Sequence, residues 1–141
     1  ADTDGSGQLI QKLLKDQGHT VVEYHLVKDE PAQIQLWIAR AMTNEAVQAL
    51  IINGGTGISR RDGTFEAVDE MLEKRLPGFG EIFRLLTYQE MGSPAIMSRA
   101  TAGIIKGRCI FSIPGSEHAV KMAMEKLILP ELGHLVQQLS K

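Results

Sequence analysis

Apolar residues are arranged along this chain in two different patterns, and each pattern predicts a type of secondary structure. A spacing of three and four residues predicts amphipathic helices, whereas short runs of β-branched, aromatic or continuously apolar residues predict strands. The predicted helices cover residues 8–17, 31–43, 64–76, 81–86, 95–102, 118–128 and 131–139, the last two separated at Pro130. The predicted strands cover residues 19–27, 46–52 and 108–113.

The alternation of these strands and helices predicts an α/β fold. Strand 46–52, AVQALII, is almost continuously apolar, as expected of a strand that is buried on both faces of a parallel sheet. We therefore expect a three-layer α/β/α arrangement around a mainly parallel, doubly wound, Rossmann-like sheet. With 141 residues, the chain has the length of one ordinary domain, which would span residues 1–141.

A polar, glycine-rich stretch near the start, DTDGSGQLI, begins like a calcium-binding EF-hand loop. The last position of such a loop needs a bidentate Glu, but Leu13 stands there, so the sequence disfavours a calcium site. Domains of this class normally start on a strand. We therefore expect a strand before residue 1, followed by this stretch as a strand-to-helix turn with Ser6 or Gly7 at the helix cap.

Composition and charge narrow the function classes. Apolar residues make up 43% of the chain and charged residues 23%, and the formal net charge is −2. Without a basic excess or an apolar run of about 20 residues, neither nucleic-acid binding nor a membrane span is expected. No signal-peptide pattern opens the chain, and the single cysteine, Cys109, cannot form an internal disulfide, so we expect a cytoplasmic protein.

The loops that follow the predicted strands carry many of the glycine and acidic residues. They are KDEP after the first strand, GGTGISRRDGT after the second and PGSE after the third, and ADTDGSG would follow the expected preceding strand. Ligands of open parallel sheets bind beyond the carboxyl ends of the strands. We therefore expect these loops to meet at one edge of the sheet and to form the site there.

The glycine cluster Gly54, Gly55, Thr56 and Gly57 would expose backbone N–H groups without obstruction by side chains, which suits phosphate oxygens. It matches neither a Walker A loop nor the Gly-x-Gly-x-x-Gly dinucleotide fingerprint, which disfavours a nucleotide-dependent oxidoreductase. The alternative is an ordinary tight turn between a strand and a helix.

Charged residues beside this cluster favour the phosphate interpretation. Arg60 and Arg61 carry guanidinium groups that match phosphate geometry, and the Asp62 carboxylate can hold Mg²⁺. Asp29, in KDEP, offers a second carboxylate. The alternative for Asp62 or Thr64, and for Asp29, is that they only cap helices.

Other chemically active residues carry weaker signals. Ser98 and Arg99 offer a hydroxyl and a cation, or are simply surface residues of a short helix. The four histidines have no i, i+4 pair and no cysteine partners, which argues against zinc, and no Gly-x-Ser-x-Gly motif is present. Cys109 lies in a predicted buried strand and is expected to be inert. Core filling is expected of the methionines at positions 91, 97, 122 and 124.

Five motifs in fixed order resemble the MoaB/Mog-type family of molybdenum cofactor biosynthesis proteins, relatives of the gephyrin G domain. They are GGTG with RD and T after it, PGFGEIFRLLTYQEMG, AIMSRATAG, IPGS and LILPELGH. The resemblance covers nearly the whole chain and is strongest to bacterial MoaB. It implies a molybdopterin-binding domain that adenylylates molybdopterin with Mg-ATP and releases pyrophosphate. The alternative is a non-catalytic, oligomeric protein of the pathway that binds molybdopterin or its precursor.

The resemblance also implies site residues. Asp62 and Asp29 match acidic active-site positions of the family, which implies catalytic roles, with Asp62 close to Mg²⁺ carried by the nucleotide. The positions implied to bind nucleotide and pterin phosphates are Gly54, Gly55, Thr56, Gly57, Arg61, Ser98, Pro114, Gly115, Ser116, Asp4, Ser6 and Gly7.

Two residues depart from the family's pattern. Gly63 replaces a β-branched residue after Arg-Asp, which would loosen the start of the next helix, and Glu117 adds a negative charge after PGS, near the expected phosphate site. The relatives are trimers or hexamers. The resemblance therefore implies a homotrimer or homohexamer, with other proteins of the molybdenum cofactor pathway as further candidate partners.

Overall fold

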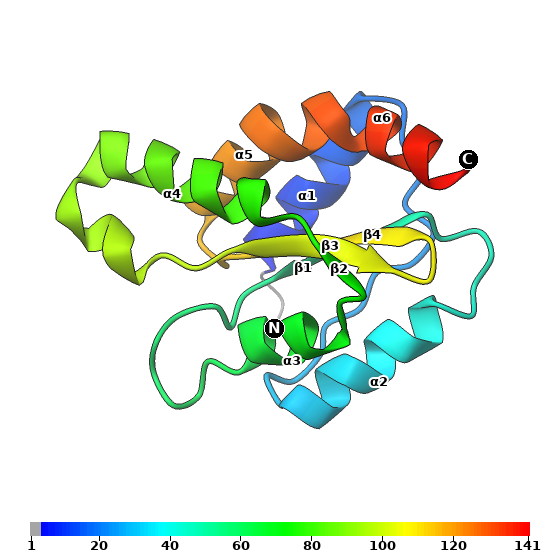
Figure 1. The fold of residues 1–141 in the computed structure, drawn as a ribbon, viewed down its shortest axis with the longest axis horizontal. Helices are drawn as coiled ribbons and strands as arrows, with labels where there is room; N and C mark the ends of the chain where they lie inside the picture. Colours follow the sequence, from blue (N-terminus) through cyan, green and yellow to red (C-terminus); the bar gives the residue numbers. More distant parts are fainter. Residues whose placement is uncertain (1–3) are drawn as a thin grey trace.

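The computed structural model describes residues 4–141 and places a mixed β-sheet between two layers of helices (Figure 1). Its strands are β1 (Ala49–Asn53), β2 (Lys74–Arg75), β3 (Thr101–Ile105) and β4 (Arg108–Ile113). Its helices are α1 (Gly5–Asp16), α2 (Pro31–Ala41), α3 (Thr64–Met71), α4 (Pro77–Met91), α5 (Glu117–Ala123) and α6 (Leu129–Leu139), with a 3₁₀ turn η1 (Ser93–Met97) and a π turn η2 (Met124–Ile128). The predicted three-layer α/β/α fold is confirmed.

The strands of the described residues are arranged in the order β1-β4-β3-β2. β1 runs parallel to β4, with Ala49 opposite Cys109 and Asn53 opposite Ile113. β3 runs antiparallel to both β4 and β2. The predicted parallel character therefore holds for the β1–β4 pair and not for the rest of this sheet.

A two-residue turn makes β3 and β4 antiparallel. Lys106 and Gly107, which join them, both have positive φ, 48° and 77°. Turns of this kind match the twist of the two strands that they connect.

The helix predicted over 95–102 is wrong, because the 3₁₀ turn ends at Met97 and the chain then enters β3.

Each face of the sheet is covered by its own helices and its own apolar core. On one face, Phe111 and Ile113 of β4 pack with Phe83, and α1, α4, α5 and α6 lie on this side (Figure 1). On the other face, Ile110 packs with Val68 and with the apolar side of α2. Successive residues of β4 thus serve opposite cores, as the two-residue period of a strand requires.

The predicted strand over 19–27 is not formed. This segment pairs with no strand of the described residues, although its β-branched and aromatic side chains favour extended structure. Most of these side chains are exposed, and several contact other parts of the chain: Glu23 accepts a hydrogen bond from Asn44, and the His25 ring lies 4.0 Å from that of Trp37. The prediction fails because a strand also needs a partner in register.

Two further helices differ from their predicted lengths. The helix predicted over 64–76 ends at Met71, because residues 74–75 extend and pair with β3. Gly103 permits this pairing, since a Cβ there would lie 2.3 Å from the Lys74 carbonyl oxygen. The short helix predicted over 81–86 is part of the longer α4, which Pro77 begins.

The helical structure is not interrupted at Pro130. Helical structure continues from α5 through η2 into α6, with Pro130 in the first turn of α6. Proline cannot donate the backbone hydrogen bond of a helix interior, and the π turn just before it relieves this defect. None of the helices between residues 4 and 141 is long and apolar enough to cross a membrane.

Candidate functional site

The loops that follow β1 and β4 meet at a cleft of about 440 Å³. The β1–α3 loop forms one side and the β4–α5 turn the next, while the residues after η1 close a third side. The predicted site residues that line this cleft are Gly54, Gly55, Thr56, Gly57, Asp62, Ser98, Pro114, Gly115 and Ser116. Residues that are far apart in the sequence thus share one cavity at the sheet edge.

The two glycine-containing loops are in direct backbone contact. The Gly54 N–H donates a hydrogen bond to the Ile113 carbonyl oxygen over 2.9 Å, and a Cβ on Gly115 would lie 3.3 Å from the Gly54 Cα. From α1, the Ser6 hydroxyl donates to the Gly115 carbonyl oxygen over 2.6 Å. Ser6 is buried and supports the turn from behind, and it does not line the cleft.

Gly55 permits the closest approach of the loop to the start of α3. Its φ is +68°, and a Cβ on it would lie 2.1 Å from the Thr64 Oγ1. The Thr64 hydroxyl donates to Asp29 Oδ1 over 3.0 Å, and the Thr64 N–H donates to the Gly55 carbonyl oxygen over 3.1 Å. Asp29 is therefore held beside the glycine loop. The capping residue of α2 is Glu30, so the helix-cap alternative for Asp29 is wrong.

Asp62 is fixed by the loop on which it lies. Its Oδ2 accepts hydrogen bonds from the Ser59 hydroxyl over 2.7 Å and from the Ser59 N–H over 3.1 Å. These bonds, together with the positive charges of Arg61 and Arg99, hold the pKa of the Asp62 carboxyl below its usual value. Asp62 is therefore ionised at neutral pH. Gly63 is the capping residue of α3, with no side-chain cap bond, so neither Asp62 nor Thr64 caps that helix.

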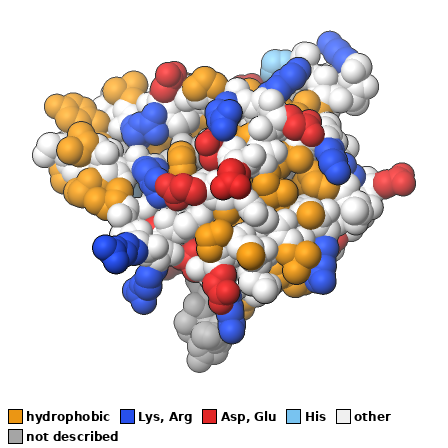
Figure 2. Space-filling view, turned by 60° about the horizontal axis from the view of Figure 1, so that its bottom comes forward, with side chains coloured by type: hydrophobic (Ala, Val, Ile, Leu, Met, Phe, Trp, Pro, Cys, Tyr) orange, Lys and Arg blue, Asp and Glu red, His pale blue; other side chains and the backbone are white. Residues whose placement is uncertain are grey.

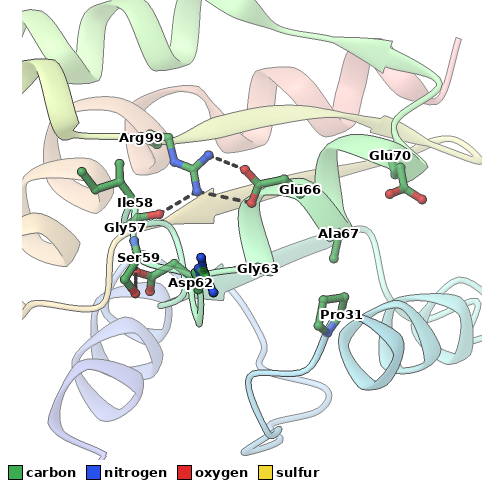
Figure 3. Close-up of a pocket in the computed structure, with 11 residues that line it drawn as sticks. Pro31, Gly57, Ile58, Ser59, Asp62, Gly63, Glu66, Ala67, Glu70 and Arg99 are labelled. Atoms are coloured by element: carbon green, nitrogen blue, oxygen red, sulfur yellow. Dashed lines mark hydrogen bonds and ion pairs between the residues drawn. The ribbon is translucent and has the colours of Figure 1, made fainter.

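Arg99 lines both the cleft and the neighbouring hollow, where its guanidinium braces the glycine loop (Figure 3). Its Nε donates to the Thr56 carbonyl oxygen over 2.8 Å and its Nη2 to the Gly57 carbonyl oxygen over 2.7 Å. The same guanidinium pairs with Glu66 on α3, lowering the pKa of that carboxyl. The sequence suggested Arg99 as a cation for the site or as a surface residue of a short helix, whereas in the structure its guanidinium is bonded to the protein itself. No local pattern could reveal this, because the carbonyl partners lie 42 and 43 residues away.

Asp62 stands where three hollows meet. It lines the cleft, a hollow of about 420 Å³ beside Arg99 and Glu66 (Figure 3), and a hollow of about 500 Å³ toward α2. The third hollow also contains Asp29 and the exposed Arg61. The two predicted catalytic carboxylates and the predicted cation thus share a cavity next to the glycine loop.

Asp4 and Gly7 belong to the cap of α1. Asp4 is its N-cap, and its Oδ1 accepts from the Gly7 N–H over 3.0 Å, while the Tyr24 hydroxyl donates to its Oδ2. The predicted cap at Ser6 or Gly7 is therefore wrong, and neither Asp4 nor Gly7 lines the cleft. Residues 1–3, the start of the polar stretch, lie outside the described residues.

The two departures from the family pattern have local explanations. A Cβ on Gly63 would lie 3.0 Å from the Pro31 Cγ, so glycine lets this loop pack against α2, and α3 begins directly after it. The Glu117 carboxylate lies beside Gly5, with its Oε1 3.3 Å from where a Cβ on Gly5 would be. A negative charge is stabilised at such a helix N-terminus.

The wall of the cleft formed by α4, η1 and α5 was not predicted from the sequence. Met91 and Met97 are 59% and 50% exposed, so the prediction that they fill the core is wrong, whereas Met122 and Met124 are buried as predicted. Helical spacing along α4 is the signal that could have revealed this wall. The residues of this wall are Phe83, Thr87, Glu90, Met91, Pro94, Met97, His118, Ala119 and Met122.

Metal and nucleophile candidates can be judged from the same geometry. Within residues 4–141, no group of three or more His, Cys, Asp or Glu side chains is placed to hold a metal ion by itself. Burial raises the pKa of the Cys109 thiol to about 11, so this residue is protonated at neutral pH and is no nucleophile. The arrangement suits chemistry that is driven by positioning and charge.

Comparison with known proteins agrees with this geometry. Residues 2–134 match the family described as "Probable molybdopterin binding domain". Molybdenum cofactor biosynthesis protein B of Halalkalibacterium halodurans is 55% identical over 141 residues, which cover 99% of this chain and 83% of that protein. The protein of the same name from Bacillus subtilis is 50% identical over the same shares.

Solved structures give the same result in three dimensions. The crystal structure of a molybdenum cofactor biosynthesis protein B has a TM-score of 0.96 and 49% identity, with 99% of this chain and 87% of that chain covered. The tungsten cofactor synthesizing protein MoaB from Pyrococcus furiosus has a TM-score of 0.88 and 37% identity, with 98% and 86% covered. This chain therefore belongs to the MoaB/Mog-type family of molybdenum cofactor biosynthesis proteins, which carry the molybdopterin-binding domain.

Proposed function

We propose that this protein binds molybdopterin and adenylylates it with Mg-ATP, in the cytoplasm, as a step of molybdenum cofactor biosynthesis. The observation that carries the proposal is the cleft, in which glycine backbone from two loops faces a cavity edged by the ionised Asp62. The family and the named relatives supply the substrate class. Glycine loops at the end of a strand, next to fixed charges, are suited to bind phosphate groups.

In the proposed reaction, an oxygen of the terminal phosphate of molybdopterin attacks the α-phosphorus of ATP. A new phosphorus–oxygen bond forms, the bond from the α-phosphorus to the oxygen that bridges to the β-phosphate breaks, and pyrophosphate leaves. Phosphoryl-type transfer depends on positioning and charge neutralisation rather than on a side-chain nucleophile. The buried, protonated Cys109 is compatible with such a mechanism.

The residues of the cleft would act mainly through their position. Gly55 and Gly57 leave no room for side chains, because a Cβ on either would collide with Thr64 or Asp62, so only backbone faces the phosphates there. The exposed Arg61 would add positive charge from the neighbouring hollow. These groups are in place before the substrate binds, which is the condition for electrostatic stabilisation of a transition state.

Asp62 and Asp29 fit a magnesium ion that arrives with the nucleotide. Both carboxylates line the same hollow, and Asp62 is ionised at neutral pH because Ser59 stabilises its negative charge. Mg²⁺ prefers oxygen ligands and is usually bound by one or two carboxylates together with water and substrate phosphates. When bound, the ion would neutralise phosphate charge.

Binding without turnover is the second candidate function, and Glu117 favours it. Its carboxylate lies at the N-terminus of α1, whose Ser6 holds the Gly115 turn. A negative charge near that turn opposes the approach of an anionic phosphate. The protein would then hold molybdopterin or its precursor without transferring AMP.

Pyrophosphate release separates the two candidates. The purified protein is incubated with ATP, Mg²⁺ and molybdopterin, and pyrophosphate is measured with each component omitted in turn. Release that requires all three supports adenylylation. Saturable molybdopterin binding without release selects the binding function, and failure to bind molybdopterin rejects both.

The proposed assembly is a homotrimer or homohexamer that forms through the outer face of α4 and η1. Ile82, Leu85 and Tyr88 on α4 and Ile96 on η1 are exposed, Ile96 to 85%. Figure 2 shows apolar side chains gathered at the end of the molecule where Figure 1 places the connection between α4 and η1. Large exposed apolar surfaces of this kind mark protein interfaces. Other proteins of the pathway are further candidate partners.

A further inference from the structure

One wall of the cleft differs in chemistry from the glycine loops. Phe83 and Met91 on α4, Met97 on η1 and Met122 on α5 give it an apolar character. Glu90, near the end of α4, adds a carboxylate. This wall has no role in the proposed transfer of AMP, although the wall and the glycine loops line the same cavity.

Glu90 is held in position by a residue from another helix. The Nε2 of His118, on the first turn of α5, lies 3.0 Å from the Glu90 Oε1. The Glu90 and His118 side chains are 45% and 66% exposed, so both are accessible to a ligand. Among residues 4–141, no hydrogen bond is formed to the Glu90 Oε2, which leaves an acceptor available at the cleft.

The two faces of α4 have different partners. Phe83, Thr87 and Glu90 recur at spacings of four and three residues and face the cleft, whereas Ile82 and Leu85 belong to the opposite, outward face. The Thr87 hydroxyl donates to the Phe83 carbonyl oxygen over 2.8 Å, inside the helix. Glu90 is thus the α4 side chain best placed to bond a ligand in this cleft.

We infer that this wall binds the pterin ring, with Glu90 recognising its 2-amino-4-oxopyrimidine edge and His118 acting as a positioning residue. This inference rests on the proposed function and locates the ring of the substrate within the cleft. The amino group and the adjacent ring N–H of that edge are neighbouring donors, and a carboxylate accepts two such bonds at once. The thioethers of Met91 and Met97 are polarizable and suit contact with a flat heteroaromatic ring.

Adenine, the other ring in the proposed reaction, fits this wall less well. Its amino group stands beside a ring nitrogen that is an acceptor, so one oxygen of a carboxylate would face a lone pair. That juxtaposition is repulsive, and it would leave a negative charge partly desolvated without a donor. The wall therefore selects the pterin over the adenine.

Two fluorescent probes test this selection directly. One is the phosphate ester of 6-hydroxymethylpterin, and the other is the corresponding lumazine ester, in which an oxygen replaces the 2-amino group. Both carry a phosphate for the loops, and only the first offers neighbouring donors to Glu90. Binding is measured by fluorescence anisotropy for the wild-type protein, for Glu90→Gln and for Glu81→Gln, a matched change on α4 outside the cleft.

The wild-type protein and Glu81→Gln are expected to prefer the pterin ester by about tenfold or more, and Glu90→Gln to reduce this preference to about threefold or less. An unchanged preference in Glu90→Gln overturns the inference, as does a wild-type protein that binds both esters equally. The proposed function fails separately, if the wild-type protein does not bind molybdopterin itself.

His118 has its own test as a positioning residue. His118→Ala removes the bond to Glu90 and is expected to weaken pterin-ester binding by about threefold, whereas His118→Gln can still donate to Glu90 and is expected to restore it. Equal weakening in both variants would show that His118 acts only through its bulk and would overturn its assigned role.

Discussion

At the scale of single residues, Gly55 carries the tightest geometric constraint of the site. Gly55→Ala combines a backbone conformation that costs non-glycine residues about 1–2 kcal/mol with a contact of 2.1 Å to Thr64. We expect a lower free energy of unfolding in urea and weaker ATP binding. Gly78→Ala on α4, where an added Cβ meets no atom within 4 Å, is the control and should be at least as stable as the wild type, because alanine is favoured over glycine in a helix. Equal behaviour of the two variants would contradict the tight packing of the loop.

The buried thiol of Cys109 should make the protein less stable at alkaline pH. Burial raises the pKa of its thiol from 9.0 to about 11, so the unfolded chain loses this proton at a lower pH than the folded protein does. Unfolding is therefore favoured as the pH rises above 9.0. Between pH 9 and 11, the free energy of unfolding of the wild type should fall by on the order of 2 kcal/mol more than that of Cys109→Ala. Parallel curves in urea titrations would show that the folded thiol ionises normally.

At the scale of elements, Arg99 connects the glycine loop to α3. Arg99→Lys keeps the charge but cannot reach the Thr56 and Gly57 carbonyls and Glu66 together, since lysine lacks the planar fork of donors. We expect ATP binding to weaken by about tenfold and stability to fall by roughly 1–3 kcal/mol.

The exposed pair formed by Arg75 and Asp69 provides the control for Arg99. Arg75→Lys makes the same change at a forked ion pair outside the cleft and should alter stability by less than about 1 kcal/mol, with ATP affinity unchanged. If both arginine variants bind ATP like the wild type, the brace has no role in nucleotide binding.

Elements also show where sequence patterns suffice and where they fail. The periods of α1 and α2 are local, so their existence and approximate bounds can be predicted from the chain itself. Strand formation depends on distant partners: β3 exists because the turn at Lys106 and Gly107 returns the chain along β4, whereas segment 19–27 has strand composition without a partner among the described residues. The same limit applies to the site. The place of the glycine loop at the site can be predicted from the sequence, but the hydrogen bonds from Arg99 to that loop cannot.

At the scale of the whole molecule, the outward face of α4 and η1 predicts self-association. The wild-type protein should sediment as a homotrimer or homohexamer, and Leu85→Glu should shift it toward the monomer, because a charge on an apolar interface must be desolvated. Leu36→Glu, at another exposed leucine on α2, should leave the mass unchanged. A monomeric wild type in analytical ultracentrifugation, or assembly lost equally in both variants, would contradict this interface.

The most direct test of the proposed function is Mg²⁺-dependent transfer of AMP to molybdopterin by the wild type, Asp62→Asn and Asp16→Asn. Asparagine at 62 can still accept the bonds from Ser59 but removes the charge at the junction of the three hollows, whereas Asp16 pairs with Lys12 on α1. We predict that the wild type and Asp16→Asn transfer AMP at the same rate, each with release of an equal amount of pyrophosphate. The rate of AMP transfer by Asp62→Asn, folded to the same stability, should be lower by a factor of about a hundred or more. Transfer by Asp62→Asn at the wild-type rate, or no transfer by the wild-type protein, would contradict the account.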